Sequence, residues 1–377
     1  MAGNRPRVFH LITRLLKGGA EAKTIATIEG LDDYEFTLGF GAEYDPEQRA
    51  AVEALGVETV RFRSMRHYNP ATAVVAVGAV ARHLHRNDYD IVHTHSTEAG
   101  IVGRLAARIA GVPNVVHTVH GVPFASDRNS VLNRFVLACE RTVAPWTDVI
   151  VTNADVISDE YLERGIGNAG QYQTVYSGID VDRFSNAEPA GDLPGERPRI
   201  VMIGRMADGK GFDVLLEAIE RLRDQDVSVI LVGDGPIRDE IESDIDRRML
   251  GDRVFALGFR EDVPSILAAS DLFVLPSFRE GTPRVITEAM AAGLPIVATD
   301  IAGIPEQVAH GENGYLVPPG DATELADRIE RLHGNDDRRS SFGTASRSRV
   351  SRFEEGKMVA ELDSLYRKLI VESSRRF

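Results

Sequence analysis

Residues 271–300 read DLFVLPSFREGTPRVITEAMAAGLPIVATD, with two short apolar runs on either side of a helical pattern. The runs DLFVLPS and PIVATD have the length and composition of buried strands. Between them, Thr282 and Pro283 suit the N-cap and first position of a helix, and Gly293 followed by Pro295 suits its end. A strand, a helix and a second strand in this order predict a right-handed βαβ unit with parallel strands.

The same alternation of apolar runs and helical patterns continues along the whole chain. The predicted strands of the first half are RVFHLIT, FTLGFG, IVHTH, NVVHTVHG, DVIVTN and TVYSGID, and those of the second half are RIVMIGR, SVILVGDG, RVFALGF, DLFVLPS, PIVATD and GYLVPP. Helices fill the intervals, and one of them, Asn69–Arg86, opens with an Asn-Pro start signal. This pattern predicts an α/β fold with two Rossmann-like doubly wound domains that face each other across a cleft.

Domain boundaries follow from composition. Residues 183–198, RFSNAEPAGDLPGERP, are rich in Pro, Gly and acidic residues and lack periodicity, so we expect a linker there. The first domain then spans residues 1–182 and the second residues 199–355. Apolar residues at helical spacing in residues 356–377 predict a last helix, which we expect to return to the first domain.

Length and composition limit the class of protein. The 377 residues are 43% hydrophobic and 27% charged, which is typical of a soluble globular protein of two domains. The single cysteine, Cys139, excludes a disulfide framework and fits a reducing compartment. No signal peptide is apparent, and the longest run without charged or strongly polar residues, about Ala71–Ala81, is shorter than the roughly 20 residues of a membrane span. We therefore expect a cytoplasmic protein.

The chain is strongly acidic, with a net charge of -14 and only five lysines. Such a composition suits a salt-rich, halophilic cytoplasm, because ions screen the repulsion between like charges. It argues against a nucleic-acid partner, since a phosphate backbone attracts a basic surface.

Residues 61–86 are an exception to this acidic character. They contain five arginines and three histidines but no acidic residue. In an acidic protein this segment indicates either an anionic lipid-linked acceptor or peripheral contact with an anionic membrane surface. A helix whose arginines are only solvated is an equally good interpretation.

A glycine-rich motif follows the strand RIVMI. Gly204 to Lys210 has the G-x-x-x-x-G-K spacing of a phosphate-binding loop, but Gly211 stands where a Ser or Thr would hold magnesium. The motif predicts a phosphate group bound by Arg205, Lys210 and backbone amides without a metal. The alternative is a glycine-rich turn with two solvated cations.

Two carboxylates, Glu280 and Glu288, flank the start of the helix in residues 271–300. Free backbone amides around Gly281 to Val285 form an anion site there, whereas carboxylates repel phosphate and suit the paired hydroxyls of sugars and ribose. Cations and amides beside carboxylates are typical of a nucleotide-sugar site. The alternatives are a solvated loop acid and a surface helix acid.

Several stretches together resemble glycosyltransferase family 4, the group 1 glycosyl transferases with the two-Rossmann GT-B fold. EGTPRVITEAMAAGLPIVATDIAGIPEQVAHGENGYLVPPGD resembles the donor-site signature of that family, and GRMADGKGF its diphosphate motif. TRLLKGGAE resembles its N-terminal Gly-Gly loop. DIVHTHSTEAG and VHTVHG resemble the ends of its first-domain strands, and YSGID its inter-domain segment. These motifs cover nearly the whole chain in the expected order.

The resemblance implies a retaining, metal-independent hexosyltransferase without a cofactor. It would move a sugar from a UDP- or GDP-linked donor to a glycan or lipid-linked acceptor in the assembly of polysaccharide, glycolipid or protein glycans. Glu280 would bind the donor sugar, Glu288 the ribose, and Arg205 with Lys210 the diphosphate. The full set of implied donor-binding residues is Gly18, Gly19, Arg205, Lys210, Phe259, Arg260, Val263, Glu280, Gly281, Thr282, Val285 and Glu288.

The resemblance also assigns a role to His120, which would face the reacting sugar and position or polarise it. The implied catalytic residues are then His120, Glu280, Arg205 and Lys210. Acceptor contacts are expected from His95, Arg61, Arg66 and Arg128, and from the loop and helix of residues 123–135.

Three alternatives stay open at this point. One is an isomerase of the nucleotide-sugar 2-epimerase kind, and another is a non-catalytic partner subunit of the same fold. In the third, His93, His95, His117 and His120 bind zinc, although their spacing matches no known zinc motif and we expect His93 and His117 to be buried and hydrogen-bonded. The sugar, the base, the acceptor and the oligomeric state are not determined by the sequence.

Overall fold

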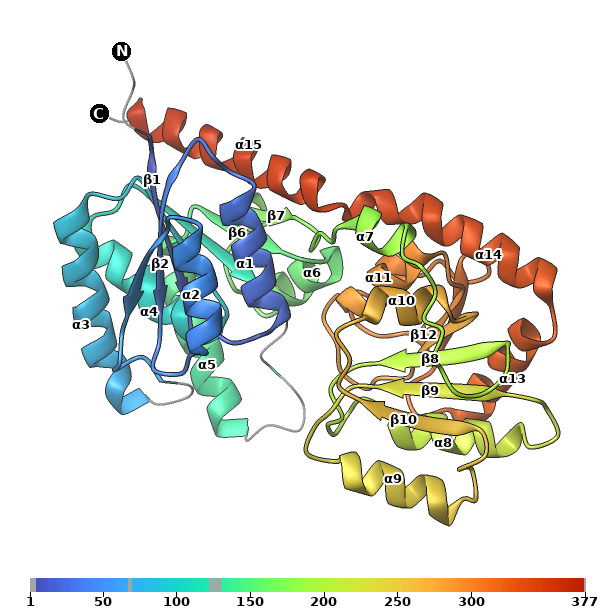
Figure 1. The fold of residues 1–377 in the computed structure, drawn as a ribbon. Helices are drawn as coiled ribbons and strands as arrows, with labels where there is room; N and C mark the ends of the chain where they lie inside the picture. Colours follow the sequence, from blue (N-terminus) through green and yellow to red (C-terminus); the bar gives the residue numbers. More distant parts are fainter. Residues whose placement is uncertain (1–4, 67–69, 122–123, 125–129, 376–377) are drawn as a thin grey trace. The chain divides into compact units, whose positions relative to one another are not determined.

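The computed structural model describes residues 5–66, 70–121, 124 and 130–375 (Figure 1). Its backbone divides into two compact units, residues 1–178 with 355–377, and residues 179–354. Each unit has one parallel sheet with helices packed against it. The predicted α/β class with two doubly wound domains is therefore confirmed.

The sheet of the first unit has seven parallel strands in the order β3-β2-β1-β4-β5-β6-β7. The strands are β1 (Arg7–Ile12), β2 (Glu35–Phe40), β3 (Glu58–Arg61), β4 (Ile91–His95), β5 (Asn114–Val119), β6 (Val149–Thr152) and β7 (Tyr172–Thr174). Sequence reasoning missed β3, which is short and has no buried residue. It also placed a strand over TVYSGID, whereas β7 ends at Thr174.

Helices cover both faces of the first sheet. They are α1 (Gly19–Glu29), α2 (Pro46–Ala54), α3 (Pro70–Asn87), α4 (Thr97–Ala110), α5 (Ser130–Val143), α6 (Asp155–Glu163) and the C-terminal α15 (Glu355–Ser374). One core joins Val8 and Ile12 of β1 to α1 and α15, and another joins Phe9 and Leu11 to α3 and α4. Alternate residues of β1 thus face opposite helix layers, as the two-residue period of a strand requires.

Helix α15 belongs to the first unit, as we expected from the sequence. Its Leu362, Leu365 and Tyr366 are buried in the same core as residues of α1. Tyr366 is fully buried, and Tyr34 donates a hydrogen bond from its hydroxyl to Asp363 on α15 over 2.8 Å.

The sheet of the second unit has six parallel strands in the order β10-β9-β8-β11-β12-β13. They are β8 (Arg199–Ile203), β9 (Ser228–Val232), β10 (Val254–Gly258), β11 (Leu272–Leu275), β12 (Ile296–Thr299) and β13 (Gly314–Val317). The helices are α7 (Val181–Ser185), α8 (Phe212–Arg221), α9 (Arg238–Arg247), α10 (Val263–Ala268), α11 (Arg284–Ala292), α12 (Ile304–Gln307), α13 (Ala322–His333) and α14 (Asp336–Arg349). Residues 183–198, which we expected to be a linker, fall within this unit.

The βαβ unit in residues 271–300 consists of β11, α11 and β12. Its helix ends at Gly293, which has the left-handed φ of 80° that favours glycine at this position. The predicted start was wrong by one residue, because Pro283 rather than Thr282 is the N-cap. A ψ of 118° at Pro283 keeps this residue outside the helix.

Both strand orders reverse direction once, between β1 and β4 and between β8 and β11. In doubly wound sheets the loops at such a reversal diverge and leave room for a ligand at the carboxyl ends of the strands. Ligand-binding residues are therefore expected at these two places. Within the described ranges, no helix combines the length and apolar character that a membrane crossing requires.

Candidate active site

The glycine-rich turn after β8 is locked to the loop after β11. Gly211 has a φ of 76°, and a Cβ atom there would lie 2.0 Å from the carbonyl oxygen of Pro276, so only glycine fits. The backbone N–H of Phe278 donates a hydrogen bond to the carbonyl of Gly209 over 2.8 Å. The two loops at the strand reversal thus form one rigid edge.

Lys210 and Glu280, one from each of these loops, form an ion pair. Lys210 Nζ lies 2.7 Å from Glu280 Oε1, and their side chains are 28% and 11% exposed. The sequence places them 70 residues apart, and the neighbouring strands β8 and β11 bring them together. The lysine lowers the cost of holding the glutamate in a partly desolvated position.

Glu288 lies on α11 and differs from a typical surface acid. Its side chain is only 15% exposed, and the nearest ion-pair contact, from Arg284 Nε, is 3.9 Å away. Burial raises the pKa of the Glu288 carboxyl, while Arg284 and Arg183 act in the opposite direction. A sheltered carboxylate with a weak partner retains the capacity to accept hydrogen bonds from hydroxyl groups.

Hydrogen bonds from residues 303–307 support the loop that contains Gly281 and Thr282. Gly303 donates its N–H to the carbonyl of Gly281 over 3.0 Å, and Gln307 Nε2 donates to the carbonyl of Pro283 over 3.0 Å. Val285, in the first turn of α11, is half-buried. This support fixes the direction of the first backbone amides of α11.

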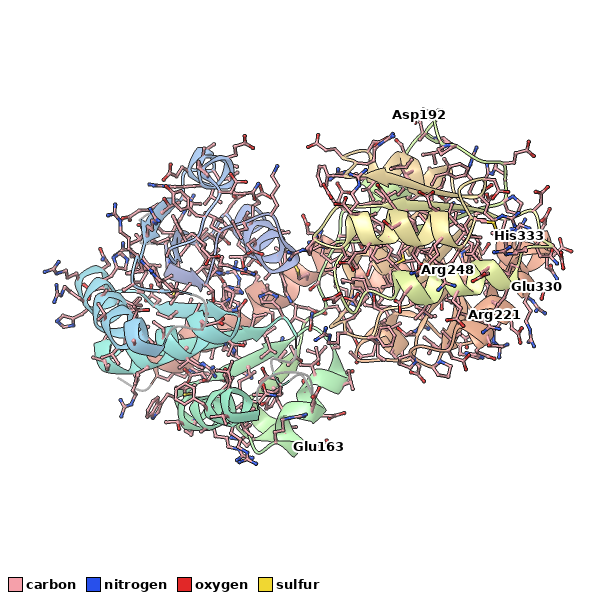
Figure 2. The ribbon with its side chains drawn as sticks, turned by 90° about the horizontal axis from the view of Figure 1, so that it is seen from below. Glu163, Asp192, Arg221, Arg248, Glu330 and His333 are labelled. Atoms are coloured by element: carbon pink, nitrogen blue, oxygen red, sulfur yellow. The ribbon has the colours of Figure 1, made fainter. Side chains whose placement is uncertain are left out.

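The remaining donor-side residues occupy the same carboxyl edge of the second sheet. Arg205 lies two residues after the end of β8 and is exposed. Phe259 follows β10 and is 66% exposed, and Val263 begins α10. Arg260 is held by Asp262 at 2.6 Å and by Asp192 at 3.2 Å. Asp192 stands at the rim of the second unit in Figure 2.

A cavity of about 680 Å³ is lined by the glycine-rich turn, by α8 and α9, and by Phe278 of the loop after β11. Its polar lining is mostly carboxylate, from Asp208, Asp213, Asp239, Glu240 and Asp244. Such a lining repels phosphate, so this cavity is a poor candidate for a diphosphate.

In the first unit, His120 follows β5 and points into a group of histidines. Its Nε2 lies 3.2 Å from His95 Nδ1. Burial lowers the pKa of His120 to about 3, with a smaller contribution from the positive charge of Lys23. His120 is therefore neutral near pH 7, and it can exchange hydrogen bonds but does not supply a positive charge.

The zinc alternative with His93, His95, His117 and His120 is contradicted by the sheet. His117 pairs with Thr94 and lies on the opposite face from His93 and His95, so the four rings do not converge. His117 Nδ1 is 3.0 Å from Thr94 Oγ1, and His93 contacts Tyr366 and Thr118, so both histidines are buried and hydrogen-bonded, as we expected.

Sequence reasoning missed His10 and Tyr366, which complete this group. His10 Nδ1 lies 2.8 Å from His95 Nε2, and the hydroxyl of Tyr366 lies 3.4 Å from His10 Nε2. His10 was a lone polar residue in the apolar run RVFHLIT, which was the available signal. Tyr366 gave none, because it lies 273 residues after His93.

The expected acceptor residues are in different environments. Arg66 is exposed, and Arg61 lies over the ring of Tyr44 at 4.5 Å and donates to the carbonyl of Ala42. His95 is buried with both ring nitrogens in hydrogen bonds, which does not support a direct contact with an acceptor. Arg128 lies outside the described residues.

Gly18 and Gly19 are at the carboxyl edge of the first sheet. Gly18 is the extended N-cap of α1 and Gly19 is its first residue. The loop that contains them therefore follows β1, the strand at which the first sheet reverses direction.

Two family models match the chain. The glycosyl transferase 4-like domain matches residues 3–178, and the glycosyl transferases group 1 model matches residues 197–335. The chain is 34% identical over 261 residues to the UDP-Gal:alpha-D-GlcNAc-diphosphoundecaprenol alpha-1,3-galactosyltransferase of Escherichia coli. The aligned region covers 66% of this chain and 67% of that protein. It is 29% identical over 321 residues to the N-acetyl-alpha-D-glucosaminyl L-malate synthase of Bacillus anthracis, with 82% of each chain covered.

Solved structures give the same result for the fold. The crystal structure of Alr3699/HepE of Anabaena in complex with UDP is similar with a TM-score of 0.83 and 25% identity. The similarity covers 96% of this chain and 100% of that chain. The whole architecture, including both sheets, is therefore shared with that protein.

Proposed function

The chain belongs to glycosyltransferase family 4 and has its GT-B fold, and from this premise we propose that it is a retaining transferase which moves a sugar from a nucleoside diphosphate donor to a glycan or lipid-linked acceptor. The Lys210–Glu280 pair at the strand reversal of the second sheet carries this proposal. It sets one cation and one carboxylate side by side where doubly wound sheets bind nucleotides.

The charges suggest a division of labour. Lys210 and the exposed Arg205 bind the diphosphate and stabilise the negative charge that develops on it as the sugar leaves. When phosphate oxygens compete for Lys210, Glu280 is released to accept hydrogen bonds from hydroxyls of the transferred sugar. The sheltered Glu288 accepts those of the ribose.

We propose that the reaction needs no bound metal. Gly211 stands in the position where a phosphate-binding loop has its metal-binding hydroxyl, and a larger residue does not fit there. Lys210 and Arg205 already supply positive charge for the phosphates. UDP occurs in the names of the E. coli relative and the Anabaena complex, which supports UDP over GDP as the carrier.

A thermal-shift screen of UDP- and GDP-sugars, with and without EDTA, tests the donor. A ligand that binds the native state raises the melting temperature by mass action. We expect one UDP-sugar to give a shift that is insensitive to EDTA, that is lost in Lys210→Ala, and that falls to the shift given by UDP alone in Glu280→Ala. If both variants keep the wild-type shift, the donor site lies elsewhere.

The composition of the helices α3, α4 and α5 of the first unit is consistent with an acceptor at a membrane surface. Together with residues 61–66 they contain nine arginines and two glutamates, in contrast to the acidic remainder of the chain. Glu140 and Arg104 form a fully buried ion pair at 2.6 Å, so eight arginines and one glutamate remain outside it. The surface that these segments present is therefore positively charged.

The same three helices border an apolar groove of about 480 Å³. Its lining includes Val74, Val77, Ile101, Leu105, Leu132 and Phe135. Arginines around apolar side chains match an anionic lipid surface, to which each arginine contributes about 1 kcal/mol. We therefore propose a cytoplasmic enzyme that works peripherally at the inner face of the membrane on a lipid-linked acceptor.

Sedimentation with vesicles that contain anionic lipid tests this surface. Replacement of the exposed Arg63, Arg66, Arg82 and Arg86 by Gln should release the protein from the vesicles. A matched control replaces four exposed arginines of the second unit, Arg221 (labelled in Figure 2), Arg223, Arg247 and Arg331. Equal binding by both variants would exclude the proposed membrane surface.

A further inference from the structure

A continuous chain of hydrogen bonds runs beneath α15 in the first unit. From His120 it passes to His95 over 3.2 Å and to His10 over 2.8 Å. It continues to the hydroxyl of Tyr366 over 3.4 Å, to His93 over 2.5 Å and to Thr118 Oγ1 over 2.7 Å. We call these six residues the histidine chain.

The strand register explains how the histidine chain forms. His10 of β1 pairs with His93 of β4, and His95, two residues further along β4, pairs with Thr118 of β5. Residues paired across strands or separated by two positions share one face of a sheet. Tyr366 reaches this face from α15, which packs on it with α1.

The imidazoles of the histidine chain are neutral, and all its members except the half-buried His120 are buried. His10, His93, His95 and Tyr366 are at most 1% exposed. Burial holds the pKa values of the histidines below their usual range, and the nearby Lys23 lowers those of His93 and His120 further. A neutral imidazole has one donor nitrogen and one acceptor nitrogen.

This rule couples the four histidines to one another. If His120 Nε2 donates to His95 Nδ1, the proton of His95 is on Nε2, which donates to His10 Nδ1. His10 Nε2 then donates to the Tyr366 oxygen, and Tyr366 donates to His93 Nδ1. All four rings carry their proton on Nε2 in this direction, and all four carry it on Nδ1 in the reverse direction.

The contacts of Tyr366 favour the first direction. Its hydroxyl is 2.5 Å from His93 Nδ1 and 3.4 Å from His10 Nε2. A hydroxyl donor gives the shorter bond of the two, since O–H donors approach an acceptor more closely than N–H donors do. Tyr366 therefore donates to His93 and accepts from His10.

We propose that Tyr366, His10 and His95 are positioning residues that fix His120 in its Nε2–H tautomer, with Nδ1 left as a hydrogen-bond acceptor for a hydroxyl of the substrate. The role of His120 toward substrate rests on the proposed function, whereas the tautomer is a property of the protein alone. Tyr366 thereby gives the C-terminal helix a part in the active site of the first unit.

A metal ion is a weaker interpretation of the same residues. Nitrogen atoms of His10, His93 and His95 lie within 4.8 Å of one another. However, both nitrogens of His93 are already hydrogen-bonded, and the His93 and His95 rings are stacked with centroids 4.2 Å apart. Stacked rings do not direct their lone pairs at a common point, as tetrahedral coordination requires.

Nitrogen-15 NMR of the wild-type protein with labelled histidine tests the proposal without any substitution. The ring nitrogens of each histidine report which of them carries the proton. We expect His10, His93, His95 and His120 all to be Nε2–H near pH 7. Mixed tautomers, four Nδ1–H rings, or zinc bound in stoichiometric amount to these rings would overturn the proposal.

Tyr366→Phe then interrupts the chain, and Tyr34→Phe is its matched control. Tyr34 also bonds to α15, through Asp363 at 2.8 Å, but has no part in the chain. In Tyr366→Phe we expect His10, His95 and His120 to become tautomer mixtures and kcat to fall about tenfold, with KM for the donor unchanged. The control should keep the wild-type spectrum and kcat.

The two readouts separate the possible failures. Single tautomers in Tyr366→Phe contradict the histidine chain, whatever the activity. Tautomer mixtures without a change in kcat support the existence of the histidine chain. They contradict its link to catalysis, and therefore the proposed role of His120. If Tyr366→Phe does not fold, the wild-type spectrum still decides the direction of the chain.

Discussion

The two sheets of this protein have the same strand order around their reversal points but place opposite kinds of side chains there. At the β8–β11 reversal the second unit has a partly exposed ion pair, Lys210 with Glu280. At the β1–β4 reversal the first unit has buried, neutral imidazoles, including His10 and His95. The topology places the Lys210–Glu280 pair at one carboxyl edge and His95 with His120 at the other, and the side chains alone make the edges different.

The difference fits two tasks. A diphosphate carries negative charge, so its binding edge needs cations that remain within reach of solvent. A hydroxyl group is neutral, and an uncharged imidazole with a fixed tautomer suits it. The comparison predicts that a low pH lowers the stability of the first unit. It also predicts that removal of a charged side chain from the second unit lowers the catalytic activity.

The largest expected effect is that of pH on the stability of the first unit. The pKa values of His10 and His120 are lowered to about 3 in the folded protein, below those of the unfolded chain. Between pH 3 and about 6.5 the unfolded chain therefore binds more protons, and the free energy of unfolding falls as the pH falls. The loss is up to about 1.4 kcal/mol per pH unit for each buried histidine.

The fluorescence of Trp146, the single tryptophan, reports the unfolding of the first unit in urea at pH 7.5 and pH 5. Pulsed hydrogen exchange, labelled at one pH, follows the second unit in the same samples. The second unit contains only His310 and His333 and should change little. An equal loss of unfolding free energy in both units at pH 5 would contradict the proposed difference between the two edges.

The next largest effect is the fall in catalytic efficiency when Lys210 is removed. Lys210→Ala should lower kcat/KM by about 10²–10³-fold, because a positioned charge that stabilises the leaving group contributes that much. Lys368→Ala is the control, since this lysine is exposed on α15 in the first unit. A loss of only a few-fold in Lys210→Ala would show that the second edge does not act on the reaction.

A smaller effect is expected for Glu288→Gln. The carboxylate accepts charge-assisted hydrogen bonds from the ribose, so donor affinity should fall about tenfold. Burial raises the pKa of Glu288 above that in the unfolded chain, so its ionised form costs stability near pH 7. The variant should therefore melt no lower than the wild type, and a clear drop in melting temperature would contradict this account of Glu288.

The repeated strand and helix patterns made the fold predictable. Buried strands such as LFVL in β11 and a helix that ends at a left-handed Gly293 have strong local signals. One strand was missed and one helix start was placed a residue too early. β3 lacks a buried face, and Thr282 was assigned to a cap position that Pro283 occupies.

The donor edge was more predictable than the first-unit site. Lys210 and Glu280 lie in motifs with a chemical meaning at short range, so the sequence alone indicates them. The histidine chain depends on register between β1 and β4 and on a tyrosine from the last helix. Such contacts arise only when distant segments pack, and no local pattern encodes them.

Calorimetric titration of UDP and of the UDP-sugar found in the screen tests the division between Lys210 and Glu280 most directly. Lys210→Ala should weaken both ligands. Glu280→Gln should bind UDP at least as tightly as the wild type, because Lys210 is released from its 2.7 Å ion pair, but should lose the added affinity of the sugar. A Glu280→Gln variant that loses UDP and UDP-sugar equally would contradict the assignment of Glu280 to the sugar.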